Sequence, residues 1–549
     1  MSMKIIKDSI HGYISLDPIY SHIIDSPEFQ RLKNIEQGSF RVLYPAARHD
    51  RFIHSLGTFH LATMFAQHFI DNIKEDLGVT ITEGSEMQHS ITQIINSFCY
   101  AALLHDIGHA PFSHTTEKFF KMKTDSSIPV IDMQLRDAVK SVVSEESFQR
   151  FDGEFPGCSP SPHEIMSATI LITNANNFLG ENIANFDLEL AARMVIGCTY
   201  DYNKDGNISP DEKLILGIKN CLIRLLNSQT VDVDKLDYIT RDTQMSGFEN
   251  VPIDIERLVR SVTAVRIGEE GWLYPAFRKN ALSVIDNVFR AKTEQGLWMV
   301  AHPVVLYDAE LLSHCINKLR TLIDESYVTN VFSIEALGTE GIELAEKKYF
   351  LLSDIDIGAD LRRFYHSEAL FCELYERQTR RRPIWKSYYE YRYLFSNAAH
   401  NITEEDVFLY FKPLIDYLKS SEIFVLDEDE YGKLMIDGDA PDPAKRSAKF
   451  LYEFFTGRKL NFNIVLLTST NSFSPKFNPS FVYILFNNLP QRNGANYETY
   501  EFLKDSSIKD DNRRLFYLYS KDKLSNEQLD ELREQLFAAL QAQREKPRV

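Results

Sequence analysis

The residues best suited to chemistry are His105 and Asp106, which follow a mostly apolar run from residue 98 to residue 104. That run predicts a buried helix, and an unpaired charge at the end of a buried helix is costly. Imidazole nitrogen and carboxylate oxygen are both metal donors, so the adjacent pair indicates a bound cation. His109 lies one turn farther on, and Gly-His-Ala-Pro ends the helix so that His114 falls in or just after a turn. A core histidine with a capping aspartate is the structural alternative.

A second histidine of this kind, His54, opens an amphipathic helix that continues through residues 61, 64 and 65. Its distance along the chain from His105 suits two helices that pack side by side. Arg51 lies one turn before His54 and would face the same pocket. An arginine beside a cation is explained when both face a phosphate group.

After His114 the chain passes Glu117 and a polar segment, residues 121–156, that we expect to be partly helical and mobile. Ser161-Pro162 then predicts the start of another helix. This helix carries His163, a candidate general acid whose ring Glu117 or Glu164 could orient.

Residues 228–242 carry four carboxylates among apolar residues. On a helix, Asp234, Lys235, Tyr238 and Asp242 share one broad polar face, while the valine, leucine and isoleucine residues between them indicate burial. Asp234 can be the fourth metal ligand. Two histidines and two carboxylates suit Fe, Mn, Co or Ni better than a closed structural zinc site.

Residues 201–212 match the EF-hand loop, with a glycine at the sixth position and an isoleucine at the eighth. Predicted helices at 188–198 and 214–226 flank the loop. A polar surface turn is the alternative. The predicted calcium ligands are Asp201, Asn203, Asp205, Asn207, Ser209 and Glu212.

Composition narrows the class of protein. The 549 residues exceed one ordinary core, and the formal charge of −18 argues against non-specific nucleic-acid binding. The six cysteines show no paired spacing, which indicates reduced thiols in a cytoplasm. The amino terminus lacks the apolar core of a signal peptide, and no stretch reaches the apolar length of a membrane span.

The remaining patterns predict a mainly α protein with a smaller mixed α/β carboxy-terminal lobe. Residues 7–16 alternate like a strand or hairpin, and Asp25 or Ser26 caps a helix that includes Gln30, Arg31 and Lys33 as its solvated face. We expect domains at 1–330 and 331–549, the second being regulatory or oligomerising. In the second domain we expect residues 354–400 to be helical, with the basic run 377–382 as a solvated helix end. We expect strands at 462–467, 481–486 and 515–519, and a terminal helix at 525–543.

His54, His105-Asp106 and Asp234 together match the H…HD…D signature of HD-domain phosphohydrolases. Four sequence motifs around these residues restrict the resemblance to a smaller family: 29–32 (FQRL), 51–57 (RFIHSLG), 105–114 (HDIGHAPFSH) and 232–238 (DVDKLDY). They resemble the deoxynucleoside triphosphate triphosphohydrolases, closest to the sterile-alpha-motif and HD-domain type but without that motif's own domain. The resemblance runs from about residue 4 to residue 310 and implies an HD-domain helical core.

The resemblance also implies roles for particular residues. His54, His105, Asp106 and Asp234 would hold a divalent transition metal (Fe, Mn, Co, Ni or Zn), and Mg²⁺ would accompany the triphosphate. His163 would be the general acid, oriented by Glu117. The triphosphate would be surrounded by Arg51, His109, His114, Lys235 and Lys292, and the sugar by Gln37, Tyr238 and Asp242. Gly38 and Val300 stand where the family has a leucine and a tyrosine beside the sugar.

The implied activity is metal-dependent hydrolysis of a deoxynucleoside triphosphate (dNTP) to a deoxynucleoside and inorganic triphosphate. Another HD-type nucleotide hydrolase and a non-catalytic nucleotide sensor are the alternatives. The family implies a homo-oligomer, dimer or tetramer, activated by GTP or dGTP. The activator would contact Lys4, Asp25, Gln30 and Lys33; Arg257 and Arg278 also align with it, whereas Trp298 replaces a basic residue.

Overall fold

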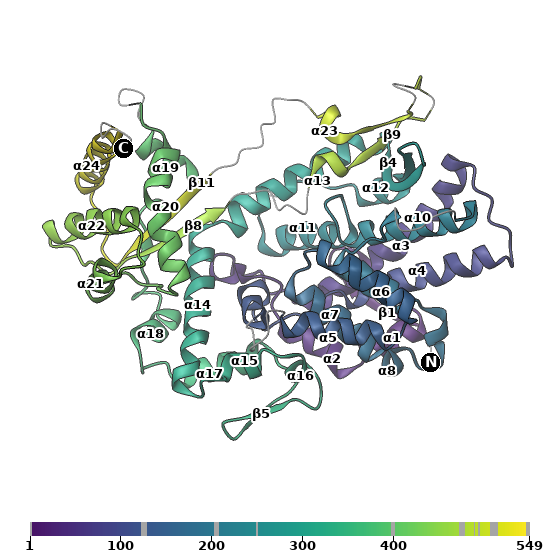
Figure 1. Ribbon diagram of the computed structural model, residues 1–549, viewed down its shortest axis with the longest axis horizontal. Coiled ribbons are helices and arrows are strands. Elements are labelled where there is room, and N and C mark those ends of the chain that lie inside the picture. Colours follow the sequence, from purple (N-terminus) through teal and green to yellow (C-terminus); the bar gives the residue numbers. More distant parts are fainter. Residues whose placement is uncertain are drawn as a thin grey trace. The chain divides into compact units, whose positions relative to one another are not determined.

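The fold is that of a computed structural model, which describes residues 3–121, 129–202, 208–248, 251–396, 401–470, 478–487, 489–491, 495–504 and 514–544 (Figure 1). The chain forms two compact units. The first comprises Met1–Gln295, Leu319–Ala359 and Phe473–Lys509, and the second comprises Gly296–Lys318, Asp360–Ser472 and Asp510–Val549. Helices dominate both units, so the predicted mainly α class is confirmed.

Four helices of the first unit carry the predicted site. Helix α3 (Arg51–Leu77) starts where the Asp50 side chain accepts a hydrogen bond from the amide of Ile53, and it packs against α4 (Glu86–Leu104) and α11 (Val233–Ser246). Helix α7 (Pro162–Thr173) begins with a capping box between Ser161 and Glu164. The apolar faces of these helices form a continuous core, which fixes where their polar ends meet.

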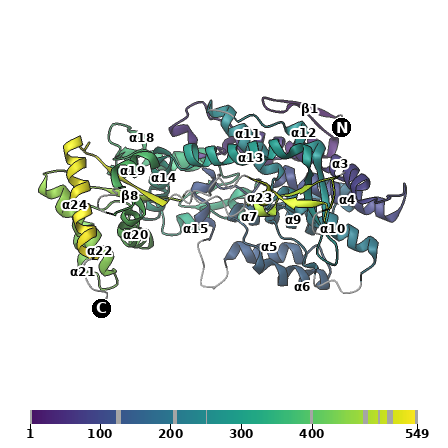
Figure 2. The ribbon, with the colours of Figure 1, turned by 90° about the horizontal axis from the view of Figure 1, so that it is seen from above.

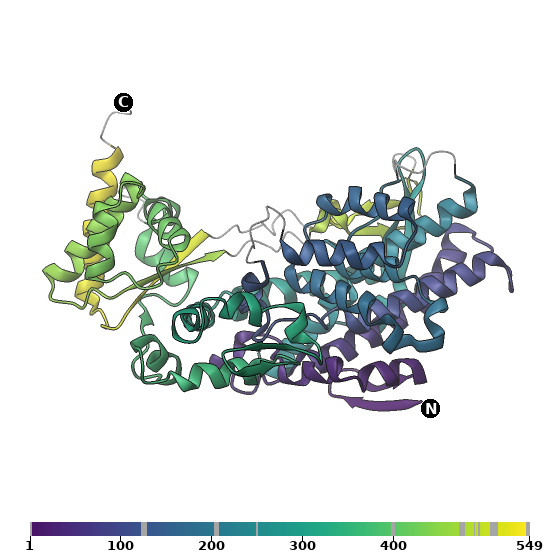
Figure 3. The ribbon, with the colours of Figure 1, turned by 60° about the horizontal axis from the view of Figure 1, so that its bottom comes forward.

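The strands of the first unit form three small sheets. Strands β1 (Lys4–Asp8) and β2 (Gly12–Leu16) make the expected hairpin, coloured purple in Figure 3. Strand β3 (Val262–Ile267) pairs antiparallel with β4 (Trp272–Arg278). Strand β9 (Tyr483–Leu485) comes from late in the chain, pairs parallel to β4 and antiparallel to β10 (Tyr497–Thr499) (Figure 2). The third sheet pairs β5 (Ile342–Leu344) with β6 (Lys347–Tyr349).

Further helices complete the first unit around this core. They are α1 (Pro18–Ile24), α2 (Pro27–Gln30), α5 (Val130–Lys140), α6 (Glu145–Glu154), α8 (Ala175–Leu179), α9 (Leu188–Ile196), α10 (Pro210–Leu226), α12 (Ile255–Ser261), α13 (Leu282–Gln295), α15 (Tyr327–Val331), α16 (Ile334–Leu337) and α23 (Tyr500–Leu503). Helices α14 (Pro303–Leu322) and α17 (Asp354–Arg363) each include residues of both units.

The second unit is smaller and mixes helices with a sheet, but its residues are not those of the expected domain 331–549. Its sheet has the order β7–β11–β8, formed by Arg382–Pro383, Arg514–Ser520 and Val465–Thr470. Trp385 is the centre of its core, with ring centroids of Phe395 and Phe516 each 5.2 Å away. The helices are α18 (Ala369–Tyr375), α19 (Tyr388–Phe395), α20 (Glu404–Ser420), α21 (Glu428–Ile436), α22 (Asp442–Gly457) and the yellow α24 (Asn526–Arg544) of Figure 2.

Three expectations about individual residues are wrong. Cys158 and Cys198 form a disulfide, because α7 and α9 pack side by side and bring their Cα atoms within 5.6 Å. Arg31 is buried instead of solvated, because its guanidinium donates hydrogen bonds to backbone carbonyls. The basic run 377–382, expected to be solvated, contains the buried Arg381, whose partner is the buried Glu373. In the described part of the chain, no helix combines the length and apolarity needed to cross a bilayer.

Candidate active site

The predicted metal donors come together at the ends of three helices. Nε2 of His54, on α3, lies 3.2 Å from Nε2 of His105 and 3.1 Å from Oδ1 of Asp234, on α11. Asp106 completes the set, with its oxygens 3.6 Å from His54 and 3.5 Å from His105. The three elements therefore direct two imidazoles and two carboxylates at one point.

The outer contacts of the two imidazoles define which nitrogen faces that point. Nδ1 of His54 donates to Oδ2 of Asp237 at 2.7 Å, and Nδ1 of His105 donates to the carbonyl of Ala102 at 2.9 Å. Both Nδ1 atoms therefore face protein acceptors, and the two Nε2 atoms face each other among carboxylates, where a bound cation would take the place of any proton on them. Burial lowers the pKa of His54, but hydrogen bonds to Asp234 and Asp237 raise it to about 10. The donor set fits a divalent cation.

Asp237 is a residue that sequence reasoning missed. Its carboxylate accepts two hydrogen bonds from Arg241, at 2.8 and 2.9 Å, and faces His11 at 2.6 Å. Arg241 also donates to Asp8, at the tip of the amino-terminal hairpin. Gly57 makes room for this network, since a Cβ there would lie 1.9 Å from Asp237 Oδ1. In the sequence, the glycine of the RFIHSLG motif is the feature that could have indicated a close neighbour at this position.

The turn after His105-Asp106 is held from outside. The Arg31 guanidinium donates to the carbonyls of Ile107 and His109, and burial lowers its pKa to about 10. Gly108 lies against α7, where a Cβ would be 2.4 Å from the backbone nitrogen of Ser167. Phe112 has a left-handed backbone, with φ of 59°, and its amide donates to Asp354 at 2.6 Å. These contacts fix the turn that carries the candidate catalytic histidines.

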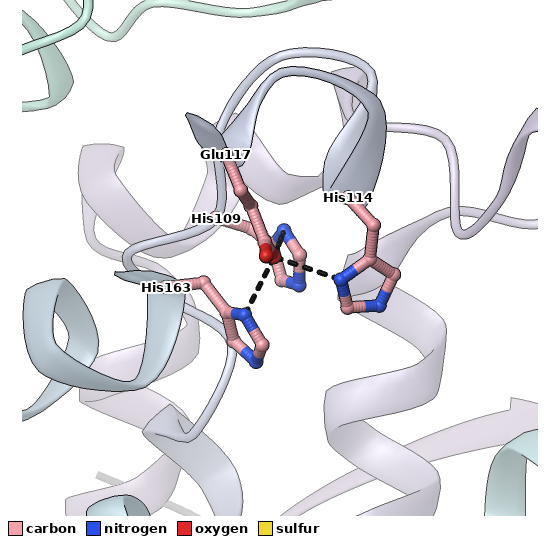
Figure 4. Close-up of side chains that lie close together, drawn as sticks. All are labelled: His109, His114, Glu117 and His163. Carbon is pink, nitrogen blue, oxygen red and sulfur yellow. Dashed lines mark hydrogen bonds and ion pairs between the residues drawn. The ribbon is translucent and has the colours of Figure 1, made fainter. Parts of the chain in front are cut away.

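Glu117 lies at the centre of the second group (Figure 4). Its Oε1 accepts from Nδ1 of His163 at 2.6 Å and from Nδ1 of His114 at 2.8 Å. Burial alone would lower the pKa of His163, but the Glu117 carboxylate outweighs it and raises the pKa. Glu164, the alternative orienting residue, instead caps α7 through the amide of Ser161.

His109 lies between the two groups. Its ring stacks on that of His163, with centroids 4.1 Å apart. Its Nε2 is 3.6 Å from Oδ1 of Asp106, and its Nδ1 is 3.8 Å from Oε1 of Glu117. Burial and the nearby Arg51 charge lower the pKa of His109 well below its ordinary value. A neutral imidazole therefore separates the metal donors from the His163–Glu117 pair.

Two of the predicted phosphate contacts are committed to protein partners. Arg51 donates to Oδ2 of Asp106 at 2.7 Å, to Ser113 and to the carbonyl of Gln37. Lys235 donates to the carbonyl of Ser228 and to Asp232. In this structure Arg51 thus orients a metal donor, and Lys235 closes the first turn of α11.

The other predicted substrate contacts surround Tyr238. Nζ of Lys292, on α13, lies 4.4 Å from the centre of the Tyr238 ring, and burial together with the Lys235 charge lowers the lysine pKa to about 8. Asp242 accepts from His49 and from Gln295, each at 2.7 Å. Gln37 is buried, and its Oε1 has no hydrogen-bond partner among the described residues.

The predicted activator contacts lie at the surface of the amino-terminal segment. Lys4 pairs with Asp25 at 2.5 Å, and Lys33 donates to Gln30 Oε1 at 2.7 Å. Of the other aligned residues, Arg278 is paired with Glu75 and Asp76 and Arg257 is exposed.

The predicted calcium loop is described only at its two ends. Asn203, Asp205 and Asn207 lie outside the described residues. Ser209 and Glu212 form a capping box at the start of α10, where Oε2 of Glu212 accepts from the Ser209 amide at 2.8 Å. A helix cap is therefore a second reason for these two residue types.

Comparison with known proteins adds an independent observation. The deoxynucleoside triphosphate triphosphohydrolase SAMHD1 of Gallus gallus is 30% identical over 270 residues, 49% of this chain and 38% of that protein. The Homo sapiens protein of the same name is 28% identical over 359 residues, 65% of this chain and 48% of its own. An uncharacterized Methanocaldococcus jannaschii protein is 28% identical over 318 residues, 58% of this chain and 50% of its own.

The chain thus spans about half the length, or less, of these relatives. No family model matches it. The chain is similar in sequence to the deoxynucleoside triphosphate triphosphohydrolases named SAMHD1.

Proposed function

We propose that this protein hydrolyses dNTPs to deoxynucleosides and inorganic triphosphate, with a divalent transition metal held by His54, His105, Asp106 and Asp234. The observation that carries the proposal is the position of the His163–Glu117 pair next to this donor set, with only the His109 ring between them. A metal site alone would serve many reactions. A metal site beside an imidazole that a carboxylate orients, and whose pKa that carboxylate raises, suits phosphate-ester cleavage with protonation of the leaving group.

When bound, the metal polarises a phosphoryl oxygen and lowers the pKa of a water molecule. The protein supplies the rest of the reaction. Glu117 holds Nδ1 of His163, so that Nε2 can deliver a proton to the departing 5′-oxygen of the sugar. Asp237 and the Ala102 carbonyl hold the Nδ1 atoms of His54 and His105, so that the Nε2 atoms of both rings face the metal position.

The anionic triphosphate requires positive charge nearby. Lys235 is close enough to Lys292 that its charge lowers the pKa of Lys292. This is expected where two ammonium groups face a shared anion. We propose that Lys235 exchanges its Asp232 partner for phosphate on binding, accompanied by Mg²⁺. Tyr238, Asp242 and Gln37 would then meet the sugar, and the unpaired Oε1 of Gln37 is free to accept its 3′-hydroxyl.

Activation by a guanine nucleotide is part of the proposal. Asp25 can accept from the guanine edge, Gln30 can donate to it, and Lys4 and Lys33 can contact phosphate. Each of these side chains has a protein partner that is polar and surface-accessible, so exchange for a ligand is inexpensive. We further propose that the protein forms a homo-oligomer, either a dimer or a tetramer. Light scattering would measure its mass in the presence and absence of GTP.

One experiment separates the candidate functions. The pure protein is incubated with each dNTP and NTP, with Mn²⁺ or Mg²⁺ and with or without GTP, and the products are identified. Inorganic triphosphate supports the proposal. Monophosphate or diphosphate indicates another HD-type nucleotide hydrolase, and no product under any condition indicates a nucleotide sensor without turnover.

A further inference from the structure

Three imidazoles converge on one carboxylate oxygen beside the metal donors already described. Nitrogens of His163, His114 and His109 lie 2.6, 2.8 and 3.8 Å from Oε1 of Glu117 (Figure 4). One ligand atom from each of the four residues lies within 4.8 Å of all the others. The residues come from the turn after α4, the 3-10 helices Ser113–Thr115 and Glu117–Lys121, and the first turn of α7.

The ring nitrogens of His109 lack hydrogen-bond partners among the described residues. The His109 side chain is 0% exposed. The 3.8 Å from Nδ1 to Glu117 is too long for a hydrogen bond. A buried polar atom left unpaired destabilises the folded protein, so a ligand that engages this nitrogen would bind favourably.

The donor set identifies the chemistry of that ligand. Three imidazoles and one carboxylate are a tetrahedral set for zinc, with bonds of about 2.0–2.1 Å. In a tetrahedron of that size neighbouring donors are roughly 3.3 Å apart, and the three distances from Glu117 lie on both sides of this value. The His114 side chain is 64% exposed, so it can move to adjust the geometry and can admit an ion from solvent.

We propose that His109, His114, Glu117 and His163 form a second divalent-metal site that prefers zinc and is distinct from the His54, His105, Asp106 and Asp234 site. Binding at Nδ1 leaves each imidazole proton on Nε2. For His109 that proton then faces Oδ1 of Asp106, now 3.6 Å away, and can satisfy the second unpaired nitrogen.

Zinc at this site has a consequence that rests on the proposed function. Glu117 and Nδ1 of His163 are the pair that orients the general acid, and a zinc ion would occupy both. Zinc is therefore an inhibitor of the hydrolase, whereas Mn²⁺, which prefers more oxygen ligands, supports activity. Zinc stoichiometry tests the site itself, with or without any turnover.

The test uses the full chain, stripped with a chelator and then titrated with ZnCl₂ by calorimetry, with bound zinc counted by mass spectrometry after desalting. We expect two equivalents for the wild type and for His89→Ala, which removes an exposed histidine from α4. Glu117→Gln and His114→Ala should each bind one equivalent, and Asp234→Ala should keep the other. Glu117→Gln preserves side-chain volume, and thermal melting confirms that each variant is folded.

A single equivalent in the wild type overturns the proposal. Two equivalents in both Glu117→Gln and His114→Ala overturn it as well, because the second ion must then lie elsewhere. Failure of the proposed function would instead appear as two equivalents of zinc and no hydrolysis of any nucleotide under Mn²⁺. The two failures are therefore distinguishable in the same set of samples.

Discussion

Nδ1 of His54 lies 2.7 Å from Oδ2 of Asp237, so a carboxylate outside the donor set fixes which nitrogen of His54 faces the other donors. Such outer contacts change metal affinity by about 10- to 100-fold. We expect Asp237→Asn to weaken metal binding by that factor while all four donors remain. Metal titration of the variant measures this. Asp71→Asn, an exposed change on the same helix as His54, is the control.

A second substitution reaches the same contact from the other side. Gly57→Ala adds a Cβ that would lie 1.9 Å from Asp237 Oδ1, so it should displace Asp237 and weaken metal binding without altering any titratable group. Unchanged affinity in both Gly57→Ala and Asp237→Asn would show that the orientation of His54 does not depend on Asp237.

Removing a metal donor should remove metal and activity together. Asp234→Ala is the cleaner test, because its side chain is 33% exposed, whereas that of Asp106 is buried. Asp106→Ala also leaves the buried Arg51 guanidinium without its carboxylate, which costs several kcal/mol of stability. Elemental analysis of desalted protein should find the loss in both variants, with Asp71→Ala unaffected. Full metal content in both would disprove the donor assignment.

His163→Ala should lower turnover by roughly a hundred- to ten-thousand-fold, the usual contribution of a positioned general acid. Metal content under Mn²⁺ and nucleotide affinity should stay close to wild type. Glu117→Gln should lower turnover less, since the His163 ring remains in place but loses the carboxylate that holds it. A parallel loss of binding and turnover in His163→Ala would make His163 a substrate contact instead.

Asp354 should make stability depend on pH. Burial, helped by the Glu36 carboxylate, raises the pKa of this carboxyl to about 7 against the opposing effect of amide hydrogen bonds from Glu36 and Phe112 and of the Arg31 charge. A pKa raised above the unfolded value favours folding most below about pH 4, and this contribution is lost as the pH rises through about 7. Asp354→Asn does not titrate, so the difference in melting temperature between wild type and variant should change across this window. A constant difference from pH 4 to pH 8 would contradict the shifted pKa.

Calcium should raise the melting temperature if residues 201–212 bind it. Asp201→Ala should abolish that rise. Glu212→Gln separates the two explanations for the loop, because glutamine keeps the cap at Ser209 but removes a bidentate carboxylate ligand. It should lose the calcium response and keep the calcium-free melting temperature. A wild type that melts identically with and without calcium would leave only the helix cap.

The sequence predicts the elements whose signals are local. Ser26 and Ser161 mark helix starts by their type and by the proline that follows each, and both caps are present in the structure. The hairpin of residues 7–16 and the strand at 515–519 follow from alternation along a few residues. The convergence of His54, His105 and Asp234 then follows from helices of the expected length.

What the sequence does not reveal depends on contacts between distant segments. A charged residue such as Arg31 is expected in solvent, because nothing nearby in the chain shows that three backbone carbonyls surround it. The same holds for the Cys158–Cys198 pair, and for Asp354, which holds the Phe112 amide from a separation of 242 residues. The acidic partners of Arg51 and Lys235, which are Asp106 and Asp232, likewise become visible only in the folded protein.

The parallel pairing of β4 with β9 has a consequence for synthesis on the ribosome. Strand β4 ends at Arg278, and its partner begins at Tyr483. At roughly 5–20 residues per second, translation leaves the edge of β4 uncovered for about 10–40 s, while most of the second unit is being made. An unpaired strand edge is a template for association between chains. Nascent or truncated forms that stop before residue 483 should therefore aggregate or recruit chaperones, although every candidate catalytic residue is already present in them.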